Sequence, residues 1–358
     1  MPPISVMLKP ASSSCNLRCK YCFYHDVAEN REMPSRGMMT TQTLETVLKK
    51  AFAHADGNAV MLSFQGGEPL LRGKTFFRAL DSMLGRLNIK KSPVHIGIQT
   101  NGTLIDDEWC GIFQSGNYLV GLSLDGDARA NENRIDADGK PVFGRIIEAA
   151  HLLKQHGVQF NILSVLTKSV AERIDEIYAF FKAEGFSHLQ FIPCLKPLDG
   201  AAENDGLSPD ADAYAHFLKT AFSLYLKDMK NGDYTSVRQF DNFAVLANGK
   251  RAEQCGMNGH CTHQYVIEAD GEVYPCDFYC TDEYSLGNIL STDFAALERS
   301  PKAIDFIKQS LTVEEKCKKC AYYRLCGNGC KRERRDIDKC GAYKAFFAYA
   351  LPHLKRMS

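Results

Sequence analysis

The sequence has no excess of charge and no long apolar run, and each absence excludes a class of protein. Lys and Arg together number 43, as do Asp and Glu, so the formal net charge is zero. Bulk charge therefore does not direct the chain to nucleic acid or to a membrane surface. No segment approaches the roughly 18 apolar residues of a membrane span, and the first residues lack the basic and apolar regions of a secretory signal. We expect a cytoplasmic protein that binds neither nucleic acid nor membrane.

Cysteine is too scarce for a disulfide scaffold but too frequent to ignore. The chain has 14 cysteines among 358 residues, and grouped cysteines in a reducing compartment predict metal or cluster ligands before disulfides. Three lie within residues 15–22 and nine lie beyond residue 250, with only Cys110 and Cys194 between the groups. This distribution predicts a metal-bearing N-terminal loop, a long conventional domain and a C-terminal metal-bearing module.

Residues 1–195 alternate short apolar runs with amphipathic stretches. The apolar runs, rich in β-branched residues, predict strands at Ile4–Leu8, Val60–Phe64, Val94–Ile98, Leu119–Leu124, Val158–Leu166 and Leu189–Ile192. Helical spacing between them predicts helices that include Thr41–His54, Thr75–Leu87, Phe143–His156 and Val170–Glu184. Such repetition predicts an α/β fold with a parallel sheet, open or curled into a barrel, whose active residues follow the C-terminal ends of the strands. Two more helices, one to about Lys230 and one near 237–248, place the domain boundary near residues 231–250.

Three cysteines after the first predicted strand have the spacing C-x3-C-x2-C: Cys15, Cys19 and Cys22. Three thiolates on one loop can hold a 4Fe-4S cluster and leave one iron open, and an open metal position is a substrate site. A zinc site that lacks one ligand, or a set of unrelated thiols, would use the same residues. The aromatic residue after Cys22 and the strand–helix alternation favour the cluster.

This spacing, Phe23 and the strand–helix alternation together resemble the radical S-adenosylmethionine (SAM) superfamily. The resemblance implies a partial (β/α)6 TIM-like barrel, in which the open iron chelates the methionine part of SAM and a 5′-deoxyadenosyl radical is formed. Residues 65–69 resemble the family's Gly-Gly-Glu-Pro motif, which binds the methionine amino group. The SAM-binding residues that the resemblance implies are Tyr24 near the adenine, Gln65, Gly66, Gly67 and Glu68 in the motif, Ser123 and Asp125 at the ribose, and Arg134. The alternatives are an ordinary Gly-rich turn at residues 65–69, turn-forming polar residues at Ser123 and Asp125, and a core or surface tyrosine at Tyr24.

Seven of the nine cysteines beyond residue 250, all except Cys255 and Cys280, resemble the extension called SPASM, which occurs in radical enzymes that modify peptides and proteins. With Cys255 they offer eight thiolates, enough for two closed 4Fe-4S clusters or for two structural zinc sites, and spacing alone does not determine the pairing. The resemblance implies one cluster on Cys255, Cys261, Cys276 and Cys330 and another on Cys317, Cys320, Cys326 and Cys340. Cys280 is a rival for Cys276, and we expect Cys110 and Cys194 to be packing thiols. The barrel would then occupy residues 1–230, and the SPASM domain with a C-terminal helix residues 231–358.

Almost the whole chain resembles the anaerobic sulfatase-maturating enzymes, most clearly in Cys255–Gly259 and Tyr274–Tyr279. That family oxidises a Cys or Ser side chain of a sulfatase to Cα-formylglycine, with a radical that removes a Cβ hydrogen, an auxiliary cluster that accepts an electron and a base that takes a proton. Asp277, directly after Cys276, resembles the proposed base; a carboxylate that shapes the cluster turn is the alternative. The resemblance implies three 4Fe-4S clusters and SAM as cofactors. The partners would be an unfolded sulfatase or peptide and a low-potential electron donor such as flavodoxin or ferredoxin.

Two segments depart from this family's pattern: the loop before Asn133-Arg134, and the gap from Cys330 to Cys340, which is short. Two other functions also compete with this interpretation. Pro and His are missing from residues 127–132, before Asn133-Arg134, and this departure concerns loop contacts to cofactor or substrate. The first alternative is a radical SAM maturase that forms a thioether or carbon–carbon crosslink in a ribosomally made precursor peptide. The second is a non-enzymatic iron–sulfur or zinc scaffold. Formation of 5′-deoxyadenosine would exclude the scaffold, and an aldehyde on a sulfatase-motif peptide would distinguish the two enzymes.

Overall fold

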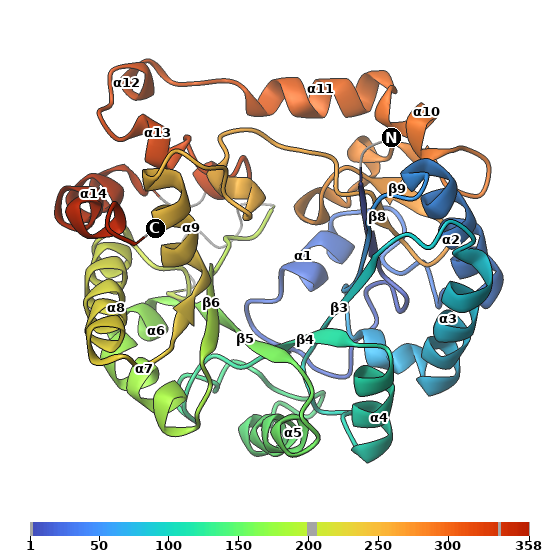
Figure 1. Cartoon of the computed structure of the whole chain (residues 1–358), viewed down its shortest axis with the longest axis horizontal. Helices are drawn as coiled ribbons and strands as arrows, with labels where there is room; N and C mark the ends of the chain where they lie inside the picture. Colours follow the sequence, from blue (N-terminus) through green and yellow to red (C-terminus); the bar gives the residue numbers. More distant parts are fainter. Residues whose placement is uncertain (1–2, 199–205, 336–337, 358) are drawn as a thin grey trace. The chain divides into compact units, whose positions relative to one another are not determined.

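The computed structural model describes residues 3–198, 206–335 and 338–357 (Figure 1). These residues form two compact units. Unit 1 consists of residues 1–123, 133–160 and 263–306, and unit 2 consists of residues 124–132, 161–262 and 307–358. Each unit therefore combines segments that are far apart in the sequence. Among the described residues, no helix is long and apolar enough to cross a membrane.

Unit 1 contains a sheet whose first four strands are parallel and pair in sequence order. They are β1 (Ile4–Leu8), β2 (Val60–Phe64), β3 (Val94–Thr100) and β4 (Tyr118–Ser123). On the other side of β1 lies β8 (Val266–Ile267), which is parallel to it, followed by the antiparallel β9 (Glu272–Tyr274) and β10 (Gly287–Asn288). This arrangement brings residues beyond 263 next to the first strand of the chain (Figure 1).

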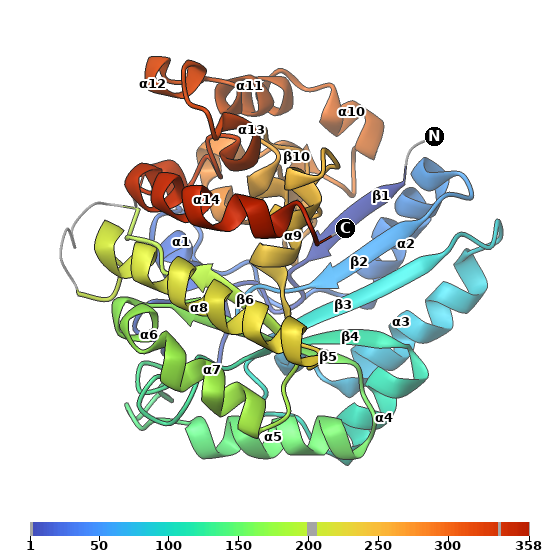
Figure 2. The ribbon, with the colours of Figure 1, turned by 60° about the vertical axis from the view of Figure 1, so that its left-hand side comes forward.

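Helices α2, α3 and α4 run along the parallel strands of unit 1 (Figure 2). Two of them begin at side-chain caps, because Thr40 accepts a hydrogen bond from the Thr43 N–H and Asp106 accepts one from the Trp109 N–H. The helices of unit 1 are α1 (Phe23–Glu29), α2 (Thr41–Ala55), α3 (Lys74–Leu87), α4 (Asp107–Ser115), α5 (Phe143–Gln155), α10 (Phe294–Glu298) and the beginning of α11 (Pro301–Ser310), with the 3-10 turn η1 (Pro69–Arg72).

The core of unit 1 is aromatic where α3 and α4 meet the sheet. The Phe77 ring lies 5.3 Å from the rings of Phe64 and Trp109 and 6.5 Å from that of Tyr118, measured between centroids. Such edge-to-face contacts add to the stabilisation from burial. Cys110 is fully buried beside this cluster, which confirms the prediction of a packing thiol.

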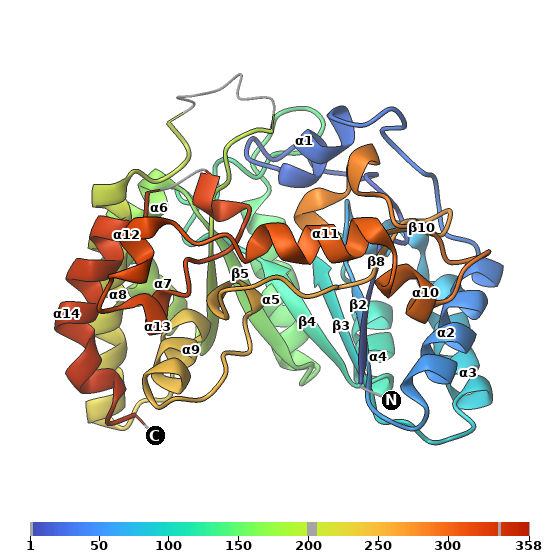
Figure 3. The same cartoon turned by 90° about the horizontal axis from the view of Figure 1, so that it is seen from above.

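Unit 2 has three parallel strands, β5 (Phe160–Leu166), β6 (His188–Pro193) and β7 (Ser236–Val237), which pair in that order. Its helices are α6 (Lys168–Glu172), α7 (Ile174–Ala183), α8 (Ala211–Asn231), α9 (Arg238–Ala247), α12 (Glu315–Lys318), α13 (Tyr323–Cys326) and α14 (Cys340–Leu354). Helices α8 and α14 lie side by side (Figure 3). Phe222 of α8 packs against Phe240 and Phe346, with ring centroids 5.1 and 5.3 Å away. The predicted helices to Lys230 and near 237–248 are confirmed as α8 and α9, and the predicted C-terminal helix as α14.

Candidate active site

The first cysteine loop, residues 15–22, connects β1 to α1 and is held against the end of β3. The Leu17 N–H lies 3.4 Å from Cys15 Sγ, and Asn101 Nδ2 lies 3.8 Å from the same sulfur. Asn101 also donates to Asn16 Oδ1 at 2.9 Å. Two amide groups therefore face the Cys15 sulfur, as hydrogen bonds to a cluster thiolate would require.

The surroundings of the three thiols of this loop suit ligands of a bound cation better than thiols that only pack in the protein core. Burial raises the pKa of Cys15 to about 12, and the charges of Glu68, Cys22 and Cys19 contribute to the rise. All three thiols are partly exposed. A thiolate in such surroundings needs a positive partner, which iron supplies. The donor set is therefore chemically suited to the predicted cluster.

The glycine pair of the predicted SAM motif packs against the segment that leads into this loop. A Cβ at Gly67 would lie 2.0 Å from Ser14 O, and one at Gly66 would lie 2.7 Å from Ser12 O. Gly66 also has a φ of +110°, which L side chains rarely adopt. The Gly67 N–H donates to Ser12 O at 2.8 Å. Glycine at both positions thus allows the backbone of the motif to approach the cysteine loop.

Glu68 joins the same motif to the end of β3. Its carboxylate accepts hydrogen bonds from the Leu70 N–H at 3.0 Å, the Thr100 hydroxyl at 2.8 Å and the Asn101 N–H at 2.8 Å. Burial raises the pKa of Glu68 to about 7, although these three hydrogen bonds act against the rise. In the sequence, Thr100 and Asn101 follow the third predicted strand, where they could line the same site or form a turn. The signal for them was a polar pair at the C-terminal end of a predicted parallel strand.

Asp277 begins the 3-10 turn η3 (Asp277–Tyr279) and is only 7% exposed. Its Oδ1 lies 3.0 Å from Lys9 Nζ, and its Oδ2 accepts a hydrogen bond from the Tyr24 hydroxyl at 2.7 Å. Gln65 Oε1 lies 3.0 Å from the same hydroxyl. Burial, followed by the Asp277 charge, raises the pKa of Tyr24 well above its ordinary value, so the phenol remains a hydrogen-bond donor. The structure thus brings the predicted base together with two of the predicted SAM-binding residues.

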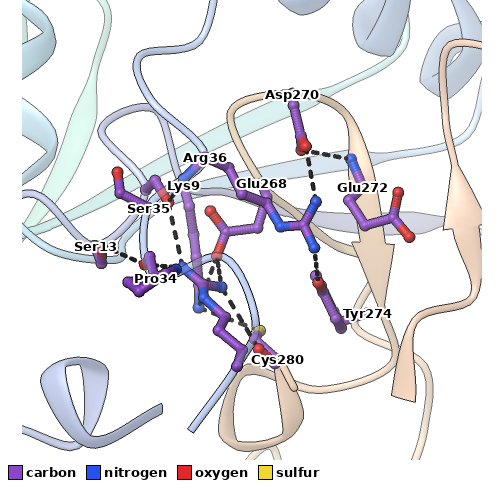
Figure 4. Close-up of polar contacts among 12 residues, drawn as sticks. Lys9, Ser13, Pro34, Ser35, Arg36, Glu268, Asp270, Glu272, Tyr274 and Cys280 are labelled. Atoms are coloured by element: carbon purple, nitrogen blue, oxygen red, sulfur yellow. Dashed lines mark hydrogen bonds and ion pairs between the residues drawn. The ribbon is translucent and has the colours of Figure 1, made fainter. Parts of the chain in front are cut away.

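Lys9, at the end of β1, was missed by the sequence predictions although it contacts this carboxylate. It is 2% exposed, and its Nζ lies 3.2 Å from Cys280 Sγ and 3.9 Å from Glu268 Oε1 (Figure 4). Burial alone would lower the pKa of Lys9, but Asp277, Cys280 and Glu268 outweigh it, and the pKa lies above its ordinary value. Arg31 donates to Glu268 Oε1 at 2.7 Å. The signals in the sequence were a charged residue directly after a predicted strand and a stretch, Lys9–Ser13, that resembles the same family.

Cys280, the rival for Cys276 as a cluster ligand, is fully buried beside Lys9. Burial raises the pKa of the Cys280 thiol to about 12. Cys276 is partly exposed, whereas the Cys280 sulfur is enclosed and lies 3.2 Å from the Lys9 ammonium. These environments support the choice of Cys276 over Cys280. Cys194, which follows β6, is also buried, in agreement with the predicted packing role.

The residues predicted at the ribose and carboxylate of SAM lie in both units. In unit 1, Ser123 is the last residue of β4 and is buried, and the Arg134 guanidinium lies 5.5 Å from the centroid of the Tyr21 ring. In unit 2, Asp125 is fully buried, and its Oδ1 accepts a hydrogen bond from the Val165 N–H at 2.8 Å. The roles of these three residues toward SAM stay predictions.

The auxiliary cysteines of unit 2 form two groups. In the first, burial raises the pKa of Cys326, and the charges of its neighbours Cys340, Cys317 and Cys320 contribute. These are the four residues that the resemblance implies for one cluster. Among the described residues, no three His, Cys, Asp or Glu side chains have the spacing of a site for a single metal ion.

The second group joins Cys255, Cys261 and Cys330. Burial and then the charge of Cys261 raise the pKa of Cys255, and burial raises that of Cys330 to about 12, with contributions from Glu333 and Cys255. Gly256 permits this approach, because a Cβ there would lie 3.1 Å from the Cβ of Cys330. The fourth predicted ligand of this cluster, Cys276, belongs to unit 1.

Comparisons with known proteins agree with these features along the whole chain. Residues 10–181 match the Radical SAM superfamily and residues 255–321 match the SPASM iron-sulfur cluster-binding domain. The Cysteine-type anaerobic sulfatase-maturating enzyme of Clostridium perfringens (strain 13 / Type A) is 43% identical over 99% of this chain and 98% of that protein. The Serine-type anaerobic sulfatase-maturating enzyme of Bacteroides thetaiotaomicron is 29% identical over 99% and 91% of the two chains.

A solved structure extends this similarity to the fold. The structure described as "Native anSMEcpe with bound AdoMet and Cp18Cys peptide" is 41% identical and matches with a TM-score of 0.94, covering 99% of each chain. The predicted fold class, an α/β protein with a radical SAM part and a SPASM part, is therefore confirmed.

Proposed function

Because the chain belongs to the family of anaerobic sulfatase-maturating enzymes, we propose that it oxidises a cysteine side chain of a sulfatase polypeptide to Cα-formylglycine. It is a radical SAM enzyme with a SPASM domain. The observation that carries the proposal is the buried Asp277 carboxylate, which directly follows the predicted ligand Cys276 and is held by Lys9 and Tyr24. A base at this place suits the removal of a proton from a thiol.

The cofactors are SAM and several 4Fe-4S clusters, as this type of enzyme requires. When bound, they supply a 5′-deoxyadenosyl radical and accept an electron from the substrate. We propose that the first cluster is held by Cys15, Cys19 and Cys22, and two auxiliary clusters by the cysteine sets named above. For SAM we propose the predicted residues Tyr24, Gln65, Gly66, Gly67, Glu68, Ser123, Asp125 and Arg134.

The contribution of the chain's own side chains is to orient the target residue and to move its proton. As a hydrogen atom leaves Cβ and an electron leaves the substrate, Asp277 takes the proton of the target thiol, and a carbon–sulfur double bond forms. Water then adds to this bond, and hydrogen sulfide leaves to give the aldehyde. The buried Asp277 carboxylate is paired with Lys9 within the protein. This pairing offsets the cost of burying a base at the place where the substrate thiol would bind.

Cysteine rather than serine is the proposed target. The Cysteine-type relative is 43% identical, whereas the Serine-type relative is 29% identical over a similar length. A thiol also loses its proton more readily than an alcohol, which suits a carboxylate base without further activation. We therefore expect a Cys-containing sulfatase peptide to be converted faster than its Ser counterpart.

The decisive experiment is an anaerobic assay of the reconstituted protein with SAM, reductant and matched sulfatase-motif peptides that carry Cys, Ser or Ala at the target position. We expect 5′-deoxyadenosine and a hydrazide-reactive aldehyde with the Cys peptide, less aldehyde with the Ser peptide, and none with the Ala peptide. A crosslinked peptide without aldehyde would show that the enzyme is instead a maturase of precursor peptides.

Three further parts of the proposal rest on the family and on the sequence. The electron for SAM cleavage would come from a low-potential donor such as flavodoxin or ferredoxin. The enzyme would act in the cytoplasm, where its clusters stay reduced and sulfatase chains are still unfolded. The barrel would occupy residues 1–230 and the SPASM domain residues 231–358.

A further inference from the structure

Buried charges of alternating sign form a chain that ends at Asp277. The order is Arg31, Glu268, Lys9 and Asp277, and the four residues are between 1% and 8% exposed. The successive distances are 2.7 Å from Arg31 to Glu268, 3.9 Å from Glu268 to Lys9 and 3.0 Å from Lys9 to Asp277. Two positive and two negative charges balance, so the group as a whole is buried without net charge.

Lys9 is bound more closely to Asp277 than to its other carboxylate. Glu268 is already paired with Arg31 at the shorter distance of 2.7 Å, which leaves the Lys9 ammonium chiefly to Asp277. A charge buried without a partner is strongly unfavourable. Lys9 is therefore the cation that pairs with this buried carboxylate.

The path of the Lys9 side chain is set by the backbone around it. The Lys9 N–H donates to Ile267 O at 2.9 Å, which ties the end of β1 to β8. A Cβ at Gly66 would lie 3.2 Å from both Cβ and Cγ of Lys9, so the first glycine of the Gly-Gly-Glu-Pro motif leaves room for the lysine stem. The Lys9 Nζ also lies 4.9 Å from the centroid of the Tyr24 ring. Lys9 is thus confined between β8, Gly66 and Tyr24.

We propose that Lys9 is a positioning residue for the oxidation: its ammonium group holds the Asp277 carboxylate in the orientation in which it takes the substrate proton. This inference rests on the proposed role of Asp277 as the base. The proposal predicts different effects of Lys9 on two steps of the reaction. Removal of the Cβ hydrogen does not need Lys9, whereas completion of the oxidation to the aldehyde does.

The test compares these two steps in Lys9→Met, Lys9→Arg and Asp277→Asn with a peptide deuterated at Cβ of its target cysteine. Deuterium in 5′-deoxyadenosine measures hydrogen removal, and aldehyde per deuterated 5′-deoxyadenosine measures completion. Since a positioned general base contributes about 100-fold or more, we expect Lys9→Met to lower the completion ratio about tenfold and to change hydrogen removal by less than about threefold. Lys9→Arg, which keeps the charge, should recover part of the loss.

The matched control is Lys90→Met, since Lys90 also pairs with an aspartate of unit 1, Asp56, but is largely exposed. It should behave as the unchanged protein. The double variant Lys9→Met with Asp277→Asn should have the same completion ratio as Asp277→Asn alone, because Lys9 acts through Asp277. If Lys9→Met does not retain its iron, Lys9→Gln replaces it in the test, and we expect the same changes in the completion ratio and in hydrogen removal.

Two outcomes would overturn the proposal while leaving the function intact. One is a completion ratio in Lys9→Met within about twofold of the unchanged protein. The other is a double variant in which the two losses multiply, which would make Lys9 independent of Asp277. If the unchanged protein forms no aldehyde on the Cys peptide, the proposed function itself fails, and this result is distinguishable from both.

Discussion

The cysteine loop of residues 15–22 and the surroundings of Asp277 lie in the same unit but differ in how their acidic groups are balanced. Burial and the charges of Glu68, Cys22 and Cys19 raise the pKa of the partly exposed Cys15 thiol. Asp277, by contrast, is paired with Lys9 at 3.0 Å. The first site is predicted to be completed by a bound cluster, whereas the second is balanced by the protein's own Lys9. The predicted ligands of the loop are close together in the sequence. The carboxylate of Asp277, by contrast, is positioned by a residue from a distant segment of the chain.

The largest effect is expected when the cysteine loop is displaced. Gly67→Ala would place a Cβ 2.0 Å from Ser14 O, so the segment that leads into Cys15 must move. We expect about a third of the iron to be lost, because one of three similar clusters is affected, and we expect SAM cleavage to be abolished. Iron and sulfide analysis and 5′-deoxyadenosine formation without peptide measure these effects.

The control for this variant is Gly85→Ala in α3, since a Cβ at Gly85 has no neighbour within 4 Å. It should keep all its iron and should stabilise the helix by about 1 kcal/mol. Full iron content and normal SAM cleavage in Gly67→Ala would contradict the account of the glycine pair.

The next largest effect concerns the base. Asp277→Asn keeps the shape of the side chain but removes the charge that takes the proton, so we expect about a 100-fold loss of aldehyde formation. Iron content should not change, since Cys276 is kept. The control is Asp270→Asn, which removes another aspartate that pairs with an arginine, Arg36, but is partly exposed. Undiminished aldehyde formation in Asp277→Asn would remove Asp277 as the base.

The smallest effect is expected from the Tyr24 hydroxyl. Tyr24→Phe removes one hydrogen bond of 2.7 Å to Asp277 but leaves the ion pair with Lys9. Since one hydrogen bond contributes about 1 kcal/mol, we expect a three- to tenfold loss of aldehyde per 5′-deoxyadenosine.

Tyr274→Phe is the control for this change, because the Tyr274 hydroxyl contacts Arg36 and not Asp277. A loss in Tyr24→Phe as large as that in Asp277→Asn would show that the tyrosine, rather than the lysine, holds the base.

Much of the fold was predictable because it depends on local patterns. Short apolar runs rich in β-branched residues identified β1 and β2 with their correct bounds, and the predicted helices to about Lys230 and near 237–248 agree with α8 and α9. The strand order did not follow from these patterns. Pairing of β8 with β1 joins residues 266–267 to residues 7–8, and no local signal encodes a contact over such a separation.

The candidate site also contains residues that the sequence predicted and residues that only the structure placed there. The predicted ligands of the first cluster follow from the spacing of the cysteines. The auxiliary ligand sets and the role of Asp277 follow from the family resemblance. Lys9 and Glu268 were missed, because a lone charged residue is more often solvated than buried.

By itself, the sequence determined the α/β class, the grouping of the cysteines and the family, since each depends on residue types at short, fixed separations. Only the tertiary structure decided how Asp277 is balanced and oriented. The physical reason is that a buried charge must be neutralised in space, and its partners come from whichever strand and loop ends the fold brings within about 4 Å.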